Sequence, residues 1–185
     1  MKRYVVIAGV NGAGKTTFYS AENTFEDIEK VNLDEIVRSI GNWKNPTDVV
    51  NAGKMAVNRI ASLFKNGISF SQETTLCGNS IIRNIRKAKE AGYSVELYYI
   101  GVDSPEIAKL RVKQRVKNGG HGVSDEDVER RYYEGLNNLK KILPLCDKAI
   151  IYNNSNRIIR LAVYQDGICK WKNKDISEWY KRYLN

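Results

Sequence analysis

The sequence predicts an α/β protein with the three-layer P-loop NTPase fold, in which a mainly parallel sheet is flanked by helices. Two observations predict this class: strands alternate with helices along most of the chain, and a glycine-rich segment, Gly9–Thr16, joins the first strand to the first helix. A third observation, two strands and a helix near the C-terminus, adds a terminal β-hairpin and helix. We expect residues 1–185 to form a single domain, because no linker rich in Gly, Pro or Ser divides them.

Hydrophobic patterns place the elements of the first half of the chain. Arg3–Ala8 is an apolar run that ends at Gly9, which is typical of a strand buried on both faces of a parallel sheet. Thr47 can cap a long helix that stops at Asn66 and Gly67, with apolar residues at helical spacing between them. The expected elements of this half are strands at 3–8 and 68–72 and helices from 14, from 33, at 45–66 and at 79–91.

The second half is expected to contain a lid and a basic tail. Two helices around the polar, Gly-rich loop 118–124 form the lid region, about 104–142. Asp166 and Gly167 suit a hairpin turn in the C-terminal hairpin and helix, about 157–185, which carry seven Lys or Arg residues against three Asp or Glu. The expected elements of this half are strands at 94–102, 149–152, 158–163 and 168–171 and helices at 104–117, from 125 to 142 and at 175–183.

Composition and charge exclude several classes of protein. Three cysteines without metal or redox spacing, three prolines and no apolar stretch of about 18 residues do not fit disulfide scaffolds, collagen-like chains or membrane-spanning proteins. The N-terminal apolar run is broken by Asn11 before it reaches signal-peptide length, so we expect a cytoplasmic protein. The formal net charge of +9 favours anionic partners without saying which, and a purely solubilising role for the surplus lysines stays open.

The segment Gly9-Val10-Asn11-Gly12-Ala13-Gly14-Lys15-Thr16 matches the P-loop pattern G-x-x-x-x-G-K-S/T at every fixed position. In such a loop the main-chain N–H groups surround phosphate oxygens and the lysine neutralises the β and γ oxygens. The hydroxyl of Thr16 would take one position on Mg²⁺. The alternative is a glycine-rich turn that binds nothing. No Asn-Lys-x-Asp segment for guanine is present, so the sequence favours a compact kinase.

Two acids are expected beside this loop, at the carboxyl edge of the sheet. Asp34 follows the expected second strand and Glu73 follows the strand that starts at Ile68. A carboxylate can hold an acceptor hydroxyl in line with the γ-phosphate and receive its proton, which is the role we predict for Asp34. Glu73 would bind the acceptor or the metal shell. A helix cap at Asp34 and a solvated surface residue at Glu73 are the alternatives.

Basic residues surround the expected lid loop. Every second residue from Lys109 to Lys117 is basic, and helical geometry puts the lysines on one face and the arginines on a roughly opposite one. The lysines are most simply solvated, whereas Arg115 leads into the glycine-rich loop and is predicted to close over the triphosphate. His121, between glycines, could contact phosphate or be incidental. Arg130 and Arg131 are candidates for a second contact or plain surface charge.

Four segments, in order and with similar spacing, resemble the zeta toxin family of P-loop kinases. The resemblance covers roughly the first 145 residues and leaves out the basic tail. The segments are Gly9–Thr17 (GVNGAGKTT), Asn32–Ile36 (NLDEI), Gln72–Thr75 (QETT) and Gly119–Tyr132 (GGHGVSDEDVERRY).

The well-known members of that family use ATP to phosphorylate the sugar 3′-hydroxyl of UDP-N-acetylglucosamine and are neutralised by an antitoxin. The resemblance implies that Asp34 is the general base, that Glu73 and Thr75 line the acceptor site, and that Arg115 is a lid arginine. The role of a second lid arginine would pass to His121 or Arg131. The residues expected to bind ATP are Gly9, Asn11, Gly12, Ala13, Gly14, Lys15, Thr16, Thr17, His121 and Arg131.

The sequence departs from the family pattern at two places in the acceptor site. No His-Pro pair follows Arg38, and Cys77-Gly78-Asn79 stands where the toxins have an arginine. The acceptor is therefore expected to be a hydroxyl of a small molecule, of which a nucleotide sugar such as UDP-N-acetylglucosamine is one example. Two alternatives stay open: an RNA-binding protein or polynucleotide kinase that uses the basic surface, and a toxin component held by an antitoxin.

Overall fold

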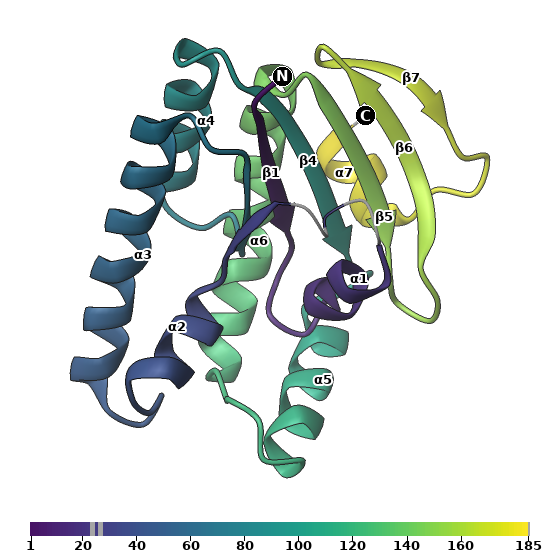
Figure 1. Cartoon of the computed structure of the whole chain (residues 1–185). Helices are drawn as coiled ribbons and strands as arrows, with labels where there is room; N and C mark the ends of the chain where they lie inside the picture. Colours follow the sequence, from purple (N-terminus) through teal and green to yellow (C-terminus); the bar gives the residue numbers. More distant parts are fainter. Residues whose placement is uncertain (23–24, 26–27, 185) are drawn as a thin grey trace.

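The computed structural model describes residues 1–22, 25 and 28–184, whose strands form one seven-stranded sheet in the order β2-β3-β1-β4-β5-β6-β7 (Figure 1). The first five strands in this order are parallel, and β6 and β7 are antiparallel additions at one edge. The predicted three-layer α/β P-loop fold with a terminal hairpin is confirmed. The strands are β1 (Arg3–Ala8), β2 (Glu29–Val31), β3 (Phe70–Thr74), β4 (Ser94–Gly101), β5 (Lys148–Asn153), β6 (Ile159–Gln165) and β7 (Ile168–Lys172).

Helices cover both faces of the sheet, with α1 in front and α6 and α7 behind in Figure 1. Successive side chains of β4 point to opposite faces of the sheet and contact different helices. The ring centroids of Tyr98 and of Phe18 in α1 are 6.0 Å apart on one face, and those of Tyr99 and of Trp179 in α7 are 5.7 Å apart on the other. The helices are α1 (Lys15–Ala21), α2 (Leu33–Ile40), α3 (Pro46–Asn66), α4 (Ser80–Glu90), α5 (Pro105–Lys117), α6 (Asp125–Ile142), the 3-10 turn η2 (Leu143–Leu145) and α7 (Glu178–Leu184).

Local contacts explain three small corrections to the predicted elements. The cap of α3 is Asn45, whose side chain accepts a hydrogen bond from the main-chain N–H of Thr47, so a cap at Thr47 is wrong. β3 ends at Thr74 rather than 72, because its last residues pair with the end of β1. The terminal helix begins at Glu178 rather than 175, after a turn in which Asn173 accepts from the following main chain.

The topology puts the ends of β1 and β3 beside each other at the carboxyl edge of the sheet. The connection from β1 leads toward β2, and the connection from β4 leads to β5 on the opposite side, so the chain reverses its direction of winding between β1 and β4. Ligands of open α/β sheets bind at such a switch point. Within the described ranges, no helix combines the length and apolar character needed to cross a membrane.

Candidate active site

The loop between β1 and α1 has the backbone conformation that its glycines predict. Gly12 and Gly14 have φ angles of 84° and 93°, in the left-handed region that glycine adopts without strain. A Cβ at Gly12 would also collide with the main-chain carbonyl of Ala108, so α5 packs directly on the loop. On another side, Nδ2 of Asn154 donates to the carbonyl oxygen of Ala13 at 2.9 Å. The loop is therefore fixed by contacts from both α5 and the segment after β5.

Lys15 begins α1 and is only 7% exposed. Its Nζ lies 3.2 Å from the carbonyl oxygen of Val10 and 3.8 Å from Oε1 of Glu73. Burial lowers the pKa of the Lys15 ammonium, and the charges of Glu73 and Asp34 act in the opposite direction. Because a buried cation needs compensating negative charge, this position favours an anionic ligand in the loop.

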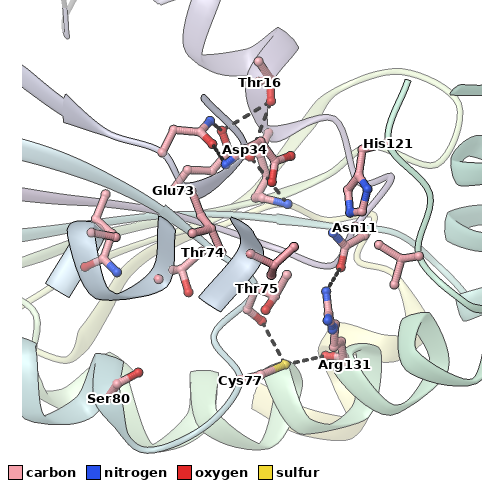
Figure 2. Close-up of a pocket in the computed structure, with 18 of the residues that line it drawn as sticks. Asn11, Thr16, Asp34, Glu73, Thr74, Thr75, Cys77, Ser80, His121 and Arg131 are labelled. Atoms are coloured by element: carbon pink, nitrogen blue, oxygen red, sulfur yellow. Dashed lines mark hydrogen bonds and ion pairs between the residues drawn. The ribbon is translucent and has the colours of Figure 1, made fainter. Parts of the chain in front are cut away.

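The two predicted acids lie together beside the loop, where Figure 2 shows Thr16, Asp34 and Glu73 on one side of the pocket. Glu73 accepts hydrogen bonds from Nδ2 of Asn32 at 2.7 Å and from the Thr16 hydroxyl at 3.3 Å. Oδ1 of Asn32 in turn accepts from the main-chain N–H of Asp34 at 2.8 Å. One buried amide therefore holds the carboxylate of Glu73 and the main chain at Asp34 relative to each other.

These contacts exclude the two alternatives for the acids. The cap of α2 is Asn32, whereas Asp34 lies inside the first turn of that helix, so a capping role for Asp34 is wrong. The side chain of Glu73 is 13% exposed and contacts three polar groups, so the alternative of a solvated strand-end glutamate is also wrong. Both side chains line the same cavity as the phosphate loop.

The two candidate arginines of α6 have different surroundings. Nη1 of Arg131 donates to Oδ1 of Asn11 in the phosphate loop at 3.0 Å (Figure 2). Arg130 instead pairs with Asp127 and Glu134 on its own helix, and its side chain is 57% exposed. Of this pair, Arg131 is the one that contacts the phosphate loop.

Arg115 and His121 form one unit at the end of the lid. Nε of Arg115 donates to the main-chain oxygen of His121 at 2.9 Å, while its Nη2 is buried without a hydrogen-bond partner among the described residues. The imidazole of His121 stacks on the indole of Trp43, with ring centroids 3.7 Å apart and planes 16° apart. Burial lowers the pKa of His121. This stack connects the lid loop to the segment between α2 and α3 across the cavity.

The sequence predicted solvated lysines on one face of α5, and for two of the three this prediction is wrong. Lys109 pairs with Glu129 and Lys113 with Asp125, and both acids belong to α6. The opposite face of α5 does turn toward the site. Arg111 donates to the carbonyl oxygens of Asn154 and Ser155, at 2.7 and 2.6 Å. The two sets of basic residues therefore have separate roles: Lys109 and Lys113 join the lid helices, and Arg111 joins the lid to the segment after β5.

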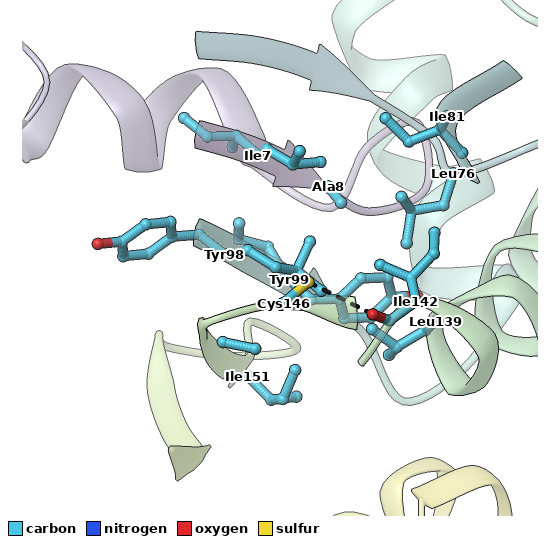
Figure 3. Close-up of a cluster of buried hydrophobic side chains, with 14 of the residues drawn as sticks. Ile7, Ala8, Leu76, Ile81, Tyr98, Tyr99, Leu139, Ile142, Cys146 and Ile151 are labelled. Carbon is cyan, nitrogen blue, oxygen red and sulfur yellow. Dashed lines mark hydrogen bonds between the residues drawn. The ribbon is translucent and has the colours of Figure 1, made fainter. Parts of the chain in front are cut away.

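The segment after β3 is held in a strained conformation. Leu76 has a φ angle of 61°, a conformation that costs a branched side chain about 1–3 kcal/mol. Its N–H donates to the hydroxyl of Thr74, its carbonyl accepts from Nδ2 of Asn138 at 2.7 Å, and its side chain is fully buried in the cluster of Figure 3. These contacts fix the positions of Thr75 and Cys77, which line the cavity on either side of Leu76.

One cavity of about 1240 Å³ brings the predicted site together. Gly9 and Ala13 are buried residues of the phosphate loop and do not line this cavity. All the other predicted site residues line it: Asn11, Gly12, Gly14, Lys15, Thr16, Thr17, Asp34, Glu73, Thr75, Arg115, His121 and Arg131.

The donor set in this cavity fits Mg²⁺ that binds together with a triphosphate. In the part of the chain that the structure describes, no three His, Cys, Asp or Glu side chains form a metal cluster. The hydroxyl of Thr16 and a carboxylate oxygen of Glu73 do converge beside Lys15. Mg²⁺ prefers such oxygen ligands and typically takes one or two from the protein and others from substrate phosphates and water.

Among the residues of the cavity wall that have no role in the sequence prediction, three make contacts that shape the site: Asn32, Trp43 and Asn154. An asparagine directly before a helix is a capping signal, and this signal identifies Asn32 as the residue that binds the main-chain N–H of Asp34. Trp43 and Asn154 lie in connections between elements, and no local pattern indicates what they contact. Their roles depend on the tertiary structure alone.

Comparison with known proteins gives both a family and structural neighbours. The zeta toxin family model matches residues 44–164. An uncharacterised protein of Haemophilus influenzae is 39% identical over 129 residues, which are 69% of this chain and 91% of that protein.

Among solved structures, a chain of the AvrRxo1-ORF1:AvrRxo1-ORF2 complex with sulphate ions has a TM-score of 0.73 and 17% identity, over 99% of this chain. This chain spans 63% of its length. The same complex with ATP has a TM-score of 0.64 and 15% identity, over 99% of this chain and 63% of that one. The PezAT toxin-antitoxin system of Streptococcus pneumoniae has a TM-score of 0.63 and 19% identity, over 100% of this chain and 77% of that one. Similarity at these identities shows a shared fold.

Proposed function

The chain belongs to the zeta toxin family, and from that premise we propose that it is an ATP-dependent kinase that phosphorylates a hydroxyl group of a small molecule. The observation that carries the proposal is the arrangement of Lys15, Glu73 and Asp34 beside the phosphate loop. It consists of a buried cation, a carboxylate held by hydrogen bonds and a second carboxylate in the first turn of α2. A glycine-rich turn that binds nothing would not need a buried lysine at its end.

The proposed reaction gives each side chain a defined task. The acceptor oxygen forms a bond to the γ-phosphorus while the bond from that phosphorus to the bridging oxygen of ADP breaks, and the hydroxyl proton passes to the carboxylate of Asp34. Mg²⁺ would be held by Thr16 and Glu73 and, when bound, neutralises charge on the phosphate oxygens. Arg131 and the buried, unpartnered Nη2 of Arg115 would stabilise the charge of the transferring group.

The acceptor belongs to the same proposal. The family resemblance makes a nucleotide sugar such as UDP-N-acetylglucosamine the first acceptor to test. Cys77 lies at the acceptor side, with Sγ 3.7 Å from the main-chain oxygens of Thr75 and Arg131. It gives this part of the wall a small, weakly polar group, so selectivity among sugars is expected to differ from that of toxins with an arginine here. Incubation with Mg-ATP and a panel of nucleotide sugars, nucleosides and RNA ends, followed by mass spectrometry, identifies the acceptor.

Replacement of Asp34 tests the mechanism. Asp34→Asn should lower turnover by about 10²–10⁴-fold, because the amide cannot receive the proton, while the affinity for ATP stays nearly unchanged. Glu35→Gln is the matched control, since Glu35 lies on the same helix, pairs with Lys30 and does not line the cavity. Turnover is measured by phosphate transfer and ATP affinity by calorimetry. Equal turnover of Asp34→Asn and wild type would remove Asp34 from the mechanism.

An antitoxin partner is a further part of the proposal. It is supported by the family and by the resemblance to the PezAT toxin-antitoxin system. Purification of the tagged chain from its own host should then recover a small protein in a fixed ratio. Recovery of the chain alone at every expression level would argue against such a partner.

A further inference from the structure

The C-terminal hairpin of β6 and β7 has one face that no helix covers. On the other face α7 packs on β6, where the hydroxyls of Tyr164 and Tyr180 are 2.6 Å apart. In Figure 1, no helix of the described ranges lies in front of β6 and β7, and β7 is the last strand of the sheet. All five residues of β7 are exposed. We call this open face of β6 and β7 the hairpin surface.

The strand register identifies side chains on the hairpin surface. Tyr152 of β5 packs on Phe18 of α1, with ring centroids 5.0 Å apart, so it points to the side of the sheet that carries α1. Arg160 of β6 is its partner in the register, and side chains of directly paired residues share a face. The Arg160 guanidinium lies over the Trp171 ring of β7, 5.2 Å from its centroid. An arginine and an indole therefore stand together on the open side.

The charge around this pair is positive and not neutralised by ion pairs. One acid, Glu22, lies near the same place, since its charge and that of Arg160 both act on the Tyr152 hydroxyl. Trp171 remains 44% exposed beside Arg160. Four exposed basic residues of the hairpin and its flanks form no ion pair with a described residue: Arg157, Arg160, Lys170 and Lys174.

The hairpin surface is separate from the candidate active site. No residue of β6 or β7 lines the cavity that contains the phosphate loop. The basic residues of the hairpin therefore have no task in the proposed phosphoryl transfer. A ligand of this surface must match an exposed indole and several cations at once.

We propose that the hairpin surface binds single-stranded nucleic acid. A base stacks on the Trp171 indole, while Arg160 and Lys170 bind phosphates on either side of it. An open sheet face suits an extended strand, because unpaired bases expose the rings that stack on aromatic side chains. A duplex hides those rings between neighbouring base pairs. An acidic peptide would neutralise the cations and leave the indole without a partner.

The stacking step is tested with a matched pair of probes. Fluorescence anisotropy compares end-labelled oligothymidylate of about 12 nucleotides with an abasic oligomer that has the same number of phosphates. We expect wild type to bind the first about tenfold more tightly, in about 50 mM salt. Oligouridylate of the same length distinguishes the two sources of such a ligand: tighter binding than that of oligothymidylate identifies RNA, and weaker binding identifies DNA.

Variants of Trp171 show whether the aromatic ring supplies this preference. Trp171→Ala should bind oligothymidylate about tenfold more weakly and the abasic oligomer as wild type does. Trp171→Phe should keep most of the affinity for oligothymidylate, because a phenyl ring also stacks. Both variants are expected to fold, since Trp171 is exposed on an edge strand. Equal affinity of wild type for the two probes, or an unchanged preference in Trp171→Ala, would refute stacking on this ring.

The cations are tested through the salt dependence of binding. Arg160→Gln/Lys170→Gln should reduce the slope of the logarithm of affinity against the logarithm of salt concentration by about 1.4, which is about 0.7 for each lost phosphate contact. Lys54→Gln/Lys65→Gln is the matched control. It removes two exposed charges from α3, which lies at the opposite side of the molecule from β7 and does not include these lysines in the cavity wall (Figure 1). The control should leave the slope unchanged.

Three results would overturn the hairpin surface as a nucleic-acid site. They are no binding of either base-containing probe at low salt, an equal loss in the α3 control, and binding of polyglutamate as tight as that of oligothymidylate. ATP affinity, measured by calorimetry, should be the same in all these variants, because the substituted residues do not line the cavity. Failure of ATP to bind, with oligonucleotide binding as described, would refute the kinase and keep the hairpin surface.

Discussion

Asn32 shows how one side chain can contribute to the geometry of the proposed reaction centre. It is 5% exposed, accepts from the main-chain N–H of Asp34 and donates to the carboxylate of Glu73. The first bond starts α2 at a defined residue, and the second fixes a carboxylate that comes from a different strand. A neutral amide does both because it has a donor and an acceptor on the same group. The position therefore has a structural and a functional contribution that substitutions can separate.

Asn32→Ser should keep the helix cap and lose the bond to Glu73. We expect its free energy of unfolding to stay within about 1 kcal/mol of wild type, because serine is also a good cap, while turnover falls. Asn32→Ala should lose both contacts, with a destabilisation of about 1–2 kcal/mol in urea unfolding and a similar fall in turnover.

The matched control for this pair is Asn45→Ala. Asn45 caps α3 in the same way, through the N–H of Thr47, but does not line the cavity. Asn45→Ala should lower the free energy of unfolding by about as much as Asn32→Ala does and should leave turnover unchanged. Equal turnover of Asn32→Ser and wild type would show that Glu73 does not depend on this amide.

At the scale of elements, two connections meet across the cavity. The segment between α2 and α3 supplies Trp43, and the loop between α5 and α6 supplies His121, which stacks on it. Three arginines, Arg38, Arg115 and Arg131, disfavour the charged imidazole electrostatically, and Asp34 favours it. Burial is the largest influence and lowers the pKa of His121. The stacked position of His121 therefore favours the neutral imidazole over the charged one.

The stability of the protein should depend on pH through this contact. Because the pKa of His121 is lower in the folded state than its ordinary value of 6.5, the unfolded chain binds the proton more tightly, and stability is lost as the pH falls from 6.5 through the folded-state pKa. His121→Phe keeps an aromatic ring and cannot titrate, so it should lose less stability than wild type between about pH 7.5 and about pH 5.

The measurement is urea unfolding at both pH values. His121 is the only histidine in the chain, so other groups contribute equally to the two proteins in this range. Identical pH dependence of wild type and His121→Phe would mean that the imidazole is not held neutral in the folded state.

The elements also show what the sequence could predict and what it could not. Periodicity predicted α3 and its apolar face, but part of that face lines a groove instead of the core, because a pattern defines a surface and not what covers it. The basic residues of α5 were assigned to two faces correctly, whereas the pairing of Lys109 and Lys113 with α6 required knowledge of how the lid helices pack. Local signals thus defined the faces of the helices, and tertiary packing defined their partners.

For the whole molecule, the parallel order of the central strands is what assembles the cavity. Residues of the phosphate loop, of the start of α2 and of the end of β3 are far apart in sequence and meet because the carboxyl ends of parallel strands share one edge. From this rule the sequence alone predicts that Lys15, Asp34 and Glu73 lie together. It could not place Trp43 or Asn154, since connections follow no such rule.

The C-terminal hairpin and helix lie outside the family resemblance stated from the sequence, yet they are built into the sheet. β6 pairs with β5 along its length, and Trp179 of α7 is 4% exposed and packs so closely on β4 that a Cβ at Gly101 would collide with its indole ring. If the chain is one cooperative domain, as the sequence predicts, a loss at this contact must also destabilise the neighbouring strand β1 and the phosphate loop that follows it.

Trp179→Ala tests that expectation. Removal of the buried indole should lower the free energy of unfolding by about 3–5 kcal/mol. Trp171→Ala is the matched control, because Trp171 is 44% exposed on the edge strand β7, and we expect it to cost less than about 1 kcal/mol. In a single domain, far-ultraviolet circular dichroism and the protection of β1 amides against hydrogen exchange should report the same loss for Trp179→Ala. Full protection of β1 in a variant whose tail has unfolded would instead divide the chain into a kinase core and a separately folding C-terminal unit.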